Sequence, residues 1–329
     1  MTRTWTASWR HSTLPPAESL PGAGTDRETS GLARATPVIS LLTDYGWADG
    51  FVGAVHSVLR QRLPLVPIVD LTHGIAAHDV RAGSLALRRA APYLASGVVL
   101  AVVDPGVGTG RRGVAVQVGH VRGQGPAAGI VFVGPDNGLL VPAIEARGGA
   151  GVAVHLEDRG YWLRSPGPTF AGRDVFAPAA AHLAAGGDML ALGRPIDPGT
   201  LARLPVPICT KHNDGSLEAE VIWVDHFGNI QLAAGPADLP GNGDLEKVTV
   251  TTAPTAVGGR GPSNNQGAPR WTARLVQVFG DLGTGELGLL VDSCGHLALC
   301  LFGASAAEWI GASERDVLVL SAPGTAQGQ

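Results

Sequence analysis

The chain has 329 residues, which is enough for two domains of ordinary size with a buried core in each. Hydrophobic residues make up 45% and charged residues 16%, a balance that favours a compact globular protein over a disordered chain. The formal net charge of -4 gives no reason to expect a nucleic-acid partner, which usually meets a basic face.

Residues 1–36 are rich in Thr, Ser, Pro, Gly and Ala without a periodic apolar pattern, and we interpret them as a disordered leader. Order is expected to begin at Pro37, where the apolar run VISLLTDYG starts. The same pattern recurs in LVPIVDLTHG, VVLAVVDPGVG and IVFVGPDNG, each of which stops at a carboxylate beside turn residues. Continuous apolar runs of this length are typical of strands that are buried on both faces of a parallel sheet.

Helical patterns separate the first three of these strands. We expect Asp49 to cap a helix through GFVGAVHSVLRQRL, Asp79 to cap one through VRAGSLALRRAAPYL, and Asp174 to cap one through VFAPAAAHLAA. The alternation of strands and helices predicts a Rossmann-like, doubly wound α/β domain over residues 37–204.

Beyond about Pro205 the sequence turns into short β-rich runs between turn residues, with a helical signal only at ASAAEWIG. This pattern predicts a small all-β barrel or sandwich over residues 205–322, followed by a flexible tail over residues 323–329. Residues 195–207 are the expected linker between the domains, and residues 253–270 are an expected mobile insertion.

Carboxylates stand at the ends of the predicted strands of the α/β domain: Asp44, Asp70, Asp104 and Asp136, with Asn137 beside the last. Ligands of open α/β sheets bind beyond the carboxyl ends of the strands. Carboxylates that converge there suit a cation, ligand hydroxyl groups or a metal, although turns and helix caps use the same residue types. The four together favour a binding site.

The most informative stretch is VDPGVGTGRR. Gly106 and Gly108 allow backbone N–H groups to approach a ligand closely, and Asp104 precedes them at the strand end. Arg111 follows one loop later, where it can fold back towards that carboxylate. The stretch matches neither GxGxxG nor GxxxxGK[ST], so anion binding and a catalytic Asp–Arg pair both stay open.

Several motifs occur in one order along the chain: TDYG with DGFVG (43–53), VDLTHGI (69–75), VDPGVGTGRR (103–112), PDNGLL (135–140), TFAGRDVFAP (169–178), VDHFGNIQ (224–231) and the stretch 293–307. Together they resemble the S-adenosylmethionine hydroxide adenosyltransferases, which are relatives of fluorinase and chlorinase. The resemblance covers nearly all of residues 37–320. It implies an α/β domain followed by a β-barrel, and a homotrimer that holds the substrate between the first domain of one subunit and the second domain of its neighbour.

The resemblance also implies the site. Asp104 and Arg111 match the first two members of a catalytic Asp–Arg–His set, whereas Ala171 stands where the family motif TFHGRD has histidine. The halogenases have tyrosine in place of Asp104, and a carboxylate there repels halide and favours water. The residues expected to bind the substrate are Asp44 for the ribose, Asp225, Asn229 and Ser293 for the methionine portion, and the backbone of Phe302–Ala304 for the adenine.

The implied activity is hydrolysis of S-adenosylmethionine to adenosine and methionine, with no cofactor and no metal, slowed by Ala171. His73, His78 and His226 are candidates to replace the missing group. Three alternatives stay open: a protein that binds S-adenosylmethionine or adenosine without turnover, a hydrolase that uses the rim carboxylates around Mg²⁺, and a halogenase.

The location of the protein is a further expectation. Its three cysteines form no CxxC pair, which argues against a disulfide scaffold or a structural zinc site and favours a reducing compartment. No apolar run approaches the ~20 residues that span a bilayer, and the first residues have no apolar core of the kind a secretory signal needs. The cytoplasm is therefore the expected location, and no membrane partner is expected.

Overall fold

The computed structural model describes residues 37–118, 129–240, 245–253 and 269–323. The expected leader over residues 1–36 lies outside the described residues, as do residues 254–268 of the expected insertion and 324–329 of the expected tail. The chain forms two compact units, and the division falls between Pro205 and Val206.

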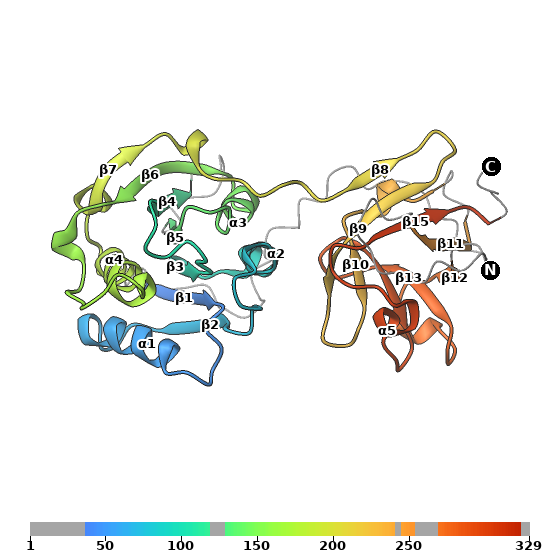
Figure 1. The fold of residues 1–329 in the computed structure, drawn as a ribbon, viewed down its shortest axis with the longest axis horizontal. Coiled ribbons are helices and arrows are strands. Elements are labelled where there is room, and N and C mark those ends of the chain that lie inside the picture. Colours follow the sequence, from blue (N-terminus) through green and yellow to red (C-terminus); the bar gives the residue numbers. More distant parts are fainter. Residues whose placement is uncertain (1–36, 119–128, 241–244, 254–268, 324–329) are drawn as a thin grey trace, which may run out of the picture. The chain divides into compact units, whose positions relative to one another are not determined.

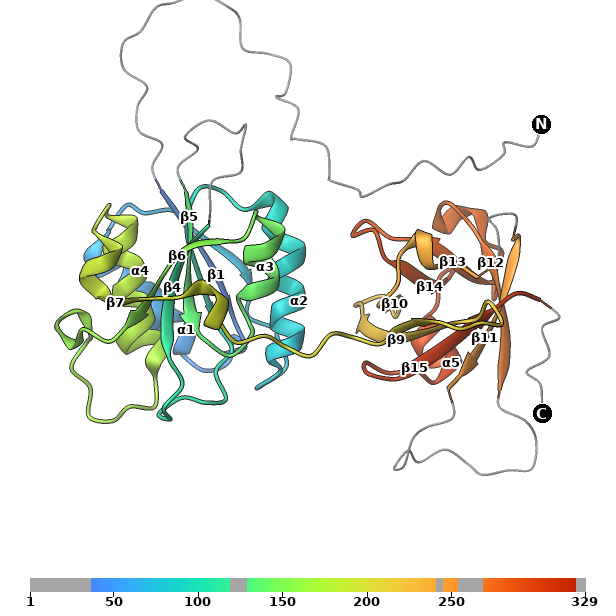
Figure 2. The same ribbon diagram turned by 90° about the horizontal axis from the view of Figure 1, so that it is seen from above.

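The first unit is built on a seven-stranded sheet in the order β2-β1-β3-β5-β4-β6-β7 (Figures 1 and 2). Its strands are β1 (Val38–Thr43), β2 (Ile68–Thr72), β3 (Gly97–Val102), β4 (Gly113–Val118), β5 (Ile130–Pro135), β6 (Ala150–Leu156) and β7 (Gly193–Ile196). The strands β2, β1, β3 and β5 are parallel, as their apolar runs predict. The strands β4 and β7 run antiparallel to their neighbours, so the sheet is mixed on one side.

Helices cover both faces of this sheet. They are α1 (Phe51–Arg62), α2 (Val80–Ala90), α3 (Val141–Ala146) and α4 (Ala177–Ala184). The helices α1 and α4 share one apolar core with the sheet, to which Val55, Leu59 and Ala180 contribute, while α2 packs with α3 on the opposite face (Figure 2). The predicted doubly wound α/β fold is confirmed.

Of the three predicted caps, one is confirmed and two are wrong. Asp79 caps α2 by accepting a hydrogen bond from the backbone N–H of Ala82 at 2.9 Å. The N-cap of α1 is Gly50 instead of Asp49, with no side-chain cap. Asp174 lies inside a π-helical turn, Gly172–Phe176, where its carboxylate accepts a hydrogen bond from Arg173. An arginine beside an aspartate competes with the backbone for the carboxylate.

The second unit is a closed barrel. Its strands are β8 (Cys209–Lys211), β9 (Leu217–Val224), β10 (Ile230–Leu232), β11 (Lys247–Thr252), β12 (Arg270–Leu275), β13 (Leu287–Val291), β14 (Leu297–Leu301) and β15 (Val317–Ser321). The sheet runs β10-β14-β13-β12-β11-β15-β9-β8, and an additional pairing of β10 with β9 closes the ring. Closure decides between the two predicted all-β forms in favour of the barrel.

One short helix, α5 (Ala306–Ile310), lies in this unit, where the sequence predicts a turn or two of helix. Ser305 caps it by accepting a hydrogen bond from the backbone N–H of Glu308 at 3.1 Å. Among the described residues, no helix is long and apolar enough to cross a membrane.

Gly134 in β5 provides a test of the sheet packing. A Cβ at this position would overlap the backbone carbonyl oxygen of Ala101, which a neighbouring strand cannot move away without breaking its pairing. Gly134→Ala is therefore expected to lower the free energy of unfolding by roughly 2–4 kcal/mol, measured by urea titration. The control is Gly53→Ala on the exposed side of α1, where nothing lies within 4 Å of the added methyl group. That variant is expected to gain roughly 0.5–1 kcal/mol, since alanine favours a helix. Equal stabilities would contradict the packing.

Candidate active site

An Asp–Arg pair stands beyond the end of β3. Arg111 donates from Nε to Asp104 Oδ1 at 2.7 Å and from Nη2 to Oδ2, so the pair is bidentate. The Asp104 side chain is 6% exposed and that of Arg111 17%, which shields the ion pair from most of the solvent. Arg111 therefore folds back onto the carboxylate as the sequence predicts.

The loop between β3 and β4 has a conformation that lets Arg111 reach back to Asp104. Gly108 has a φ of +79°, a left-handed conformation that favours glycine. A Cβ on Gly106 would lie 3.2 Å from Cγ of Arg111, so a larger residue would press on the arginine. The guanidinium lies over the ring of buried Phe176, 5.1 Å from its centroid. The arginine is thus held from two sides.

Tyr45, which sequence reasoning missed, lies within electrostatic reach of the pair. Its ring contacts Phe51 and Phe170, with centroids 5.8 and 5.5 Å away. Burial raises the pKa of Tyr45 well above its usual value; the negative charges of Asp44 and Asp104 add to this effect, and Arg111 opposes it. The phenol therefore stays protonated at neutral pH and stays a hydrogen-bond donor.

Asp44 directly follows β1 and is held by the loop before α2. Its Oδ2 accepts a hydrogen bond from the backbone N–H of His78 at 2.9 Å. His78 has a φ of +69°, which is uncommon for a residue other than glycine and points to a local constraint. The backbone N–H of His78 orients the carboxylate that the family resemblance assigns to the ribose.

Ala171, at the position of the family histidine, is half-buried and stands directly before the π-helical turn Gly172–Phe176. A Cβ on Gly172 would overlap the hydroxyl oxygen of Tyr45, so this turn passes directly under the phenol. The wider turn frees the carbonyl of Asp174, which accepts a hydrogen bond from the N–H of Leu163 at 2.8 Å. Turns of this type frequently mark functional sites.

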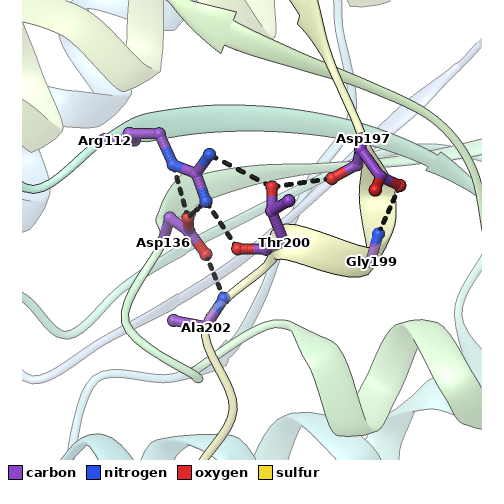
Figure 3. Close-up of polar contacts among 6 residues, drawn as sticks. All are labelled: Arg112, Asp136, Asp197, Gly199, Thr200 and Ala202. Atoms are coloured by element: carbon purple, nitrogen blue, oxygen red, sulfur yellow. Dashed lines mark hydrogen bonds and ion pairs between the residues drawn. The ribbon is translucent and has the colours of Figure 1, made fainter.

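A second Asp–Arg pair lies next to the first and serves a different purpose (Figure 3). Arg112 donates from Nε to Asp136 Oδ2 at 2.8 Å and from Nη2 to the carbonyl oxygen of Thr200 at 2.7 Å. Asp136 Oδ1 in turn accepts a hydrogen bond from the backbone N–H of Ala202 at 2.8 Å. The pair therefore fixes the segment that the sequence predicts as a linker, and Asp136 is engaged in structure.

Arg112→Ala is expected to lower the free energy of unfolding of the first unit by roughly 1–3 kcal/mol. The reason is that Asp136, whose side chain is only 4% exposed, would lose its cation. Thermal unfolding followed by circular dichroism measures the effect. Arg203→Ala is the control, because its pair with Glu145 is more than half exposed and worth at most about 1 kcal/mol. The idea fails if both variants unfold at the same temperature.

In the second unit, Asp225 and Asn229 form the turn between β9 and β10. Asp225 Oδ1 accepts hydrogen bonds from the backbone N–H groups of Phe227 and Asn229, and Oδ2 accepts one from Asn229 Nδ2 at 2.8 Å. The structure therefore brings these two predicted residues together. Their assigned role in binding methionine stays a prediction.

The residues predicted to hold adenine lie beside this turn. Phe302, 50% exposed, follows β14, and the backbone N–H of Ala307 donates to the carbonyl oxygen of Gly228 at 3.0 Å. Ala304 is exposed between them. Ser293 is exposed in the turn before β14, so it and Phe302 lie at opposite ends of that strand. The assigned role of Ser293 in binding the methionine portion stays a prediction.

The four rim carboxylates do not form one cluster. Asp104 pairs with Arg111, Asp136 pairs with Arg112, and Asp44 is held by the backbone of the α2 loop. Asp70 lies within β2 instead of at its end and contacts two histidines. Of the four, Asp44 and Asp104 both lie close enough to Tyr45 to raise its pKa. The only sequence signal for Tyr45 is its position directly after Asp44, and the apolar periodicity of the strand does not mark it as a site residue.

The chain is similar to known proteins over both of its compact units. Residues 39–193 match the model of the SAM hydroxide adenosyltransferase N-terminal domain, and residues 219–319 match that of the C-terminal domain. The (R)-S-adenosyl-L-methionine hydrolase of Salinispora tropica is 43% identical over 290 residues, which cover 87% of this chain and 98% of the relative. The fluorinase of an Actinoplanes species is 28% identical over 286 residues, covering 81% and 91%.

The fold is also similar to that of a solved structure. The crystal structure of an uncharacterized conserved protein from Thermotoga maritima matches with a TM-score of 0.72 and 28% identity, covering 86% of this chain and 100% of that one. The two family models together cover well over half of the chain, and each matches one of its two compact units. The protein belongs to the SAM hydroxide adenosyltransferase family.

Proposed function

We propose that this protein hydrolyses S-adenosyl-L-methionine to adenosine and L-methionine, and that it prefers the (R) epimer at sulfur named for its relatives. The observation that carries the proposal is the shielded, bidentate Asp104–Arg111 pair beyond β3, with Asp44 at the end of the adjacent strand. A carboxylate for the ribose and an Asp–Arg pair for water then stand on neighbouring strands of one sheet.

The hydrolysis needs neither a general acid nor a cofactor. A water oxygen attacks C5′ of the ribose, the C5′–S bond breaks, and its electron pair moves to sulfur, which leaves as a neutral thioether. No general acid is needed for the leaving group, and no cofactor enters the balance. The water loses one proton, which passes to Asp104 or to solvent.

Asp104 keeps the capacity to hold this water while it is paired. A carboxylate offers about four lone-pair positions, and Arg111 uses two of them. The fixed guanidinium stabilises developing hydroxide character, and positioning of the water alone supplies several kcal/mol of barrier reduction. The negative Asp104 also disfavours a halide at the same place.

The second candidate is a protein that binds S-adenosylmethionine or adenosine with little turnover, and Ala171 is the observation that favours it. Alanine neither accepts a proton nor orients water. We place hydrolysis first because Asp104, Arg111 and Asp44 are all present with the contacts described above.

The deciding experiment incubates purified protein with (R)- and (S)-S-adenosylmethionine and follows the products by liquid chromatography. Adenosine and methionine are expected in equal amounts, faster from the (R) epimer. Retention of intact substrate bound to the protein would establish the binding alternative. Two further arms complete the test. Formation of 5′-halogenated deoxyadenosine in concentrated chloride or fluoride would favour a halogenase, and loss of activity with chelator that Mg²⁺ restores would favour a metal-dependent hydrolase.

We further propose a homotrimer whose substrate sites combine the first unit of one subunit with the second unit of its neighbour, as the family resemblance implies. Large aromatic side chains are exposed on the second unit near the predicted adenine segment, among them Phe227, Phe302 and Trp309. Exposed apolar groups of this size often mark an interface. Light scattering should give three times the chain mass of 33.6 kDa.

The exposed thiols of Cys209 and Cys294 suit the cytoplasm, which we propose as the location.

A further inference from the structure

Two histidines and an aspartate meet at the edge of the first sheet, away from the Asp104–Arg111 pair. His56 lies on α1, Asp70 on β2, and His73 directly after β2. Asp70 Oδ1 lies 2.9 Å from Nε2 of His56 and 3.1 Å from Nε2 of His73, and the three ligand atoms all lie within 4.8 Å of one another.

These distances fit a shared metal ion. Two ligand atoms about 2.1 Å from one ion, at angles between 90° and 109°, are separated by roughly 3.0–3.4 Å. The distance from Asp70 Oδ1 to His73, 3.1 Å, lies at the short end of this range, and that to His56, 2.9 Å, lies just below it. Small rotations of the side chains are therefore enough for an ion to enter between them.

The nitrogen of His73 supplies an independent observation. The residue is 1% exposed, and within the described residues its Nε2 makes no hydrogen bond, although Asp70 lies close. A buried ring nitrogen without a hydrogen bond is costly unless something binds it. Its other nitrogen, Nδ1, lies 2.7 Å from the hydroxyl oxygen of Thr43. This is the outer-shell contact that typically fixes the ring orientation of a metal-ligating histidine.

We propose that His56, Asp70 and His73 bind one divalent transition metal ion of the Zn²⁺ class. Two imidazoles and one carboxylate form a mixed nitrogen and oxygen set that suits such ions better than Mg²⁺ or Ca²⁺, which prefer oxygen ligands alone. The His56 and Asp70 side chains are 30% and 27% exposed, which leaves the remaining coordination position to water. The family resemblance implies no metal, and a histidine followed 14 residues later by a D-x-x-H pair matches no known metal motif.

The ion would join α1 and β2 to the loop that carries Asp44. The carbonyl oxygen of His73 accepts a hydrogen bond from the N–H of Gly46 at 2.8 Å, and the ring of Trp47 stands edge-on to His73 at 4.7 Å. Both residues belong to the loop that begins with Asp44. The metal therefore acts as a structural clamp between α1, β2 and this loop, and it takes no part in the attack on C5′.

The test measures metal binding on the whole chain, with Zn²⁺ and Co²⁺ as probes. Wild-type protein, stripped with chelator and reloaded, should hold one Zn²⁺ per chain by mass spectrometry and melt roughly 5–10 °C higher at about 100-fold excess over Kd. His56→Ala should lose both the bound ion and the shift. Co²⁺ should give visible ligand-field absorption in the wild type only.

Two controls separate this site from other histidines and from the proposed activity. His212→Ala removes a similar histidine, 3.1 Å from Glu218 in the second unit, and should keep the ion. Asp104→Ala should also keep it. Substoichiometric binding to the wild type, or equal binding by His56→Ala, would overturn the proposal, whatever the outcome of the product assay.

Discussion

Replacing Asp104 with alanine is expected to lower kcat for S-adenosylmethionine hydrolysis by roughly 10²–10⁴-fold, with a smaller change in KM. The carboxylate both orients the attacking water and holds Arg111 in a bidentate contact, so the variant loses the acceptor and frees the guanidinium at once. Single-turnover kinetics with labelled substrate separate this loss of chemistry from any loss of binding.

The neighbouring pair provides a matched control. Asp136→Ala also removes a buried carboxylate from an arginine that contacts it through two nitrogens. The side chains of Asp136 and Asp104 are similarly buried, at 4% and 6% exposed. It should destabilise the first unit to a similar extent and reduce kcat far less. If both variants lose kcat equally, Asp104 contributes through stability and the proposed mechanism is wrong.

The second large effect concerns Ala171. Introducing histidine by Ala171→His is expected to raise kcat by roughly 10²–10⁴-fold if the imidazole transfers a proton, and by less if it only orients water. The position suits this gain, because the turn that follows it passes under the hydroxyl of Tyr45, which lies within electrostatic reach of Asp104 and Arg111.

Ala171→Asn separates the two roles of a histidine. Asparagine forms hydrogen bonds but does not transfer a proton near neutral pH, so it should recover only the orienting part of the gain. A pH profile of kcat that acquires a new limb near pH 6–7 in the histidine variant alone would identify proton transfer. An unchanged kcat in a variant that melts like the wild type would show that position 171 lies outside the reacting centre.

Much of the fold follows from local sequence patterns. Apolar runs that end in Asp and turn residues identify β1, β2, β3 and β5, because strands buried on both faces need continuous apolar sequence. The strands β4, β6 and β7 were not predicted, since their place in the sheet depends on pairing between distant segments. The predicted caps at Asp49 and Asp174 failed because a favourable residue type does not decide where its side chain finds a partner.

The candidate site shows the same limit. The motif around Asp104 and Arg111 predicts their contact, because only one short loop separates them. Tyr45 and the cluster of His56, Asp70 and His73 depend on the order β2-β1-β3, which places α1 and three strand ends side by side. This proximity results from the strand order of the sheet, so no single segment of the sequence predicts it.

The place of β15 in the barrel has a consequence for biosynthesis. This strand pairs with β9 on one side and β11 on the other, so it completes a ring whose other strands all come earlier in the chain. During translation, the strands and helices of the first unit are complete well before β15 leaves the ribosome, and that unit is free to fold first. The nascent barrel meanwhile exposes two unpaired strand edges, which are prone to aggregate. We expect released chains that stop before Val317 to stay bound to chaperones, whereas released chains that include β15 do not.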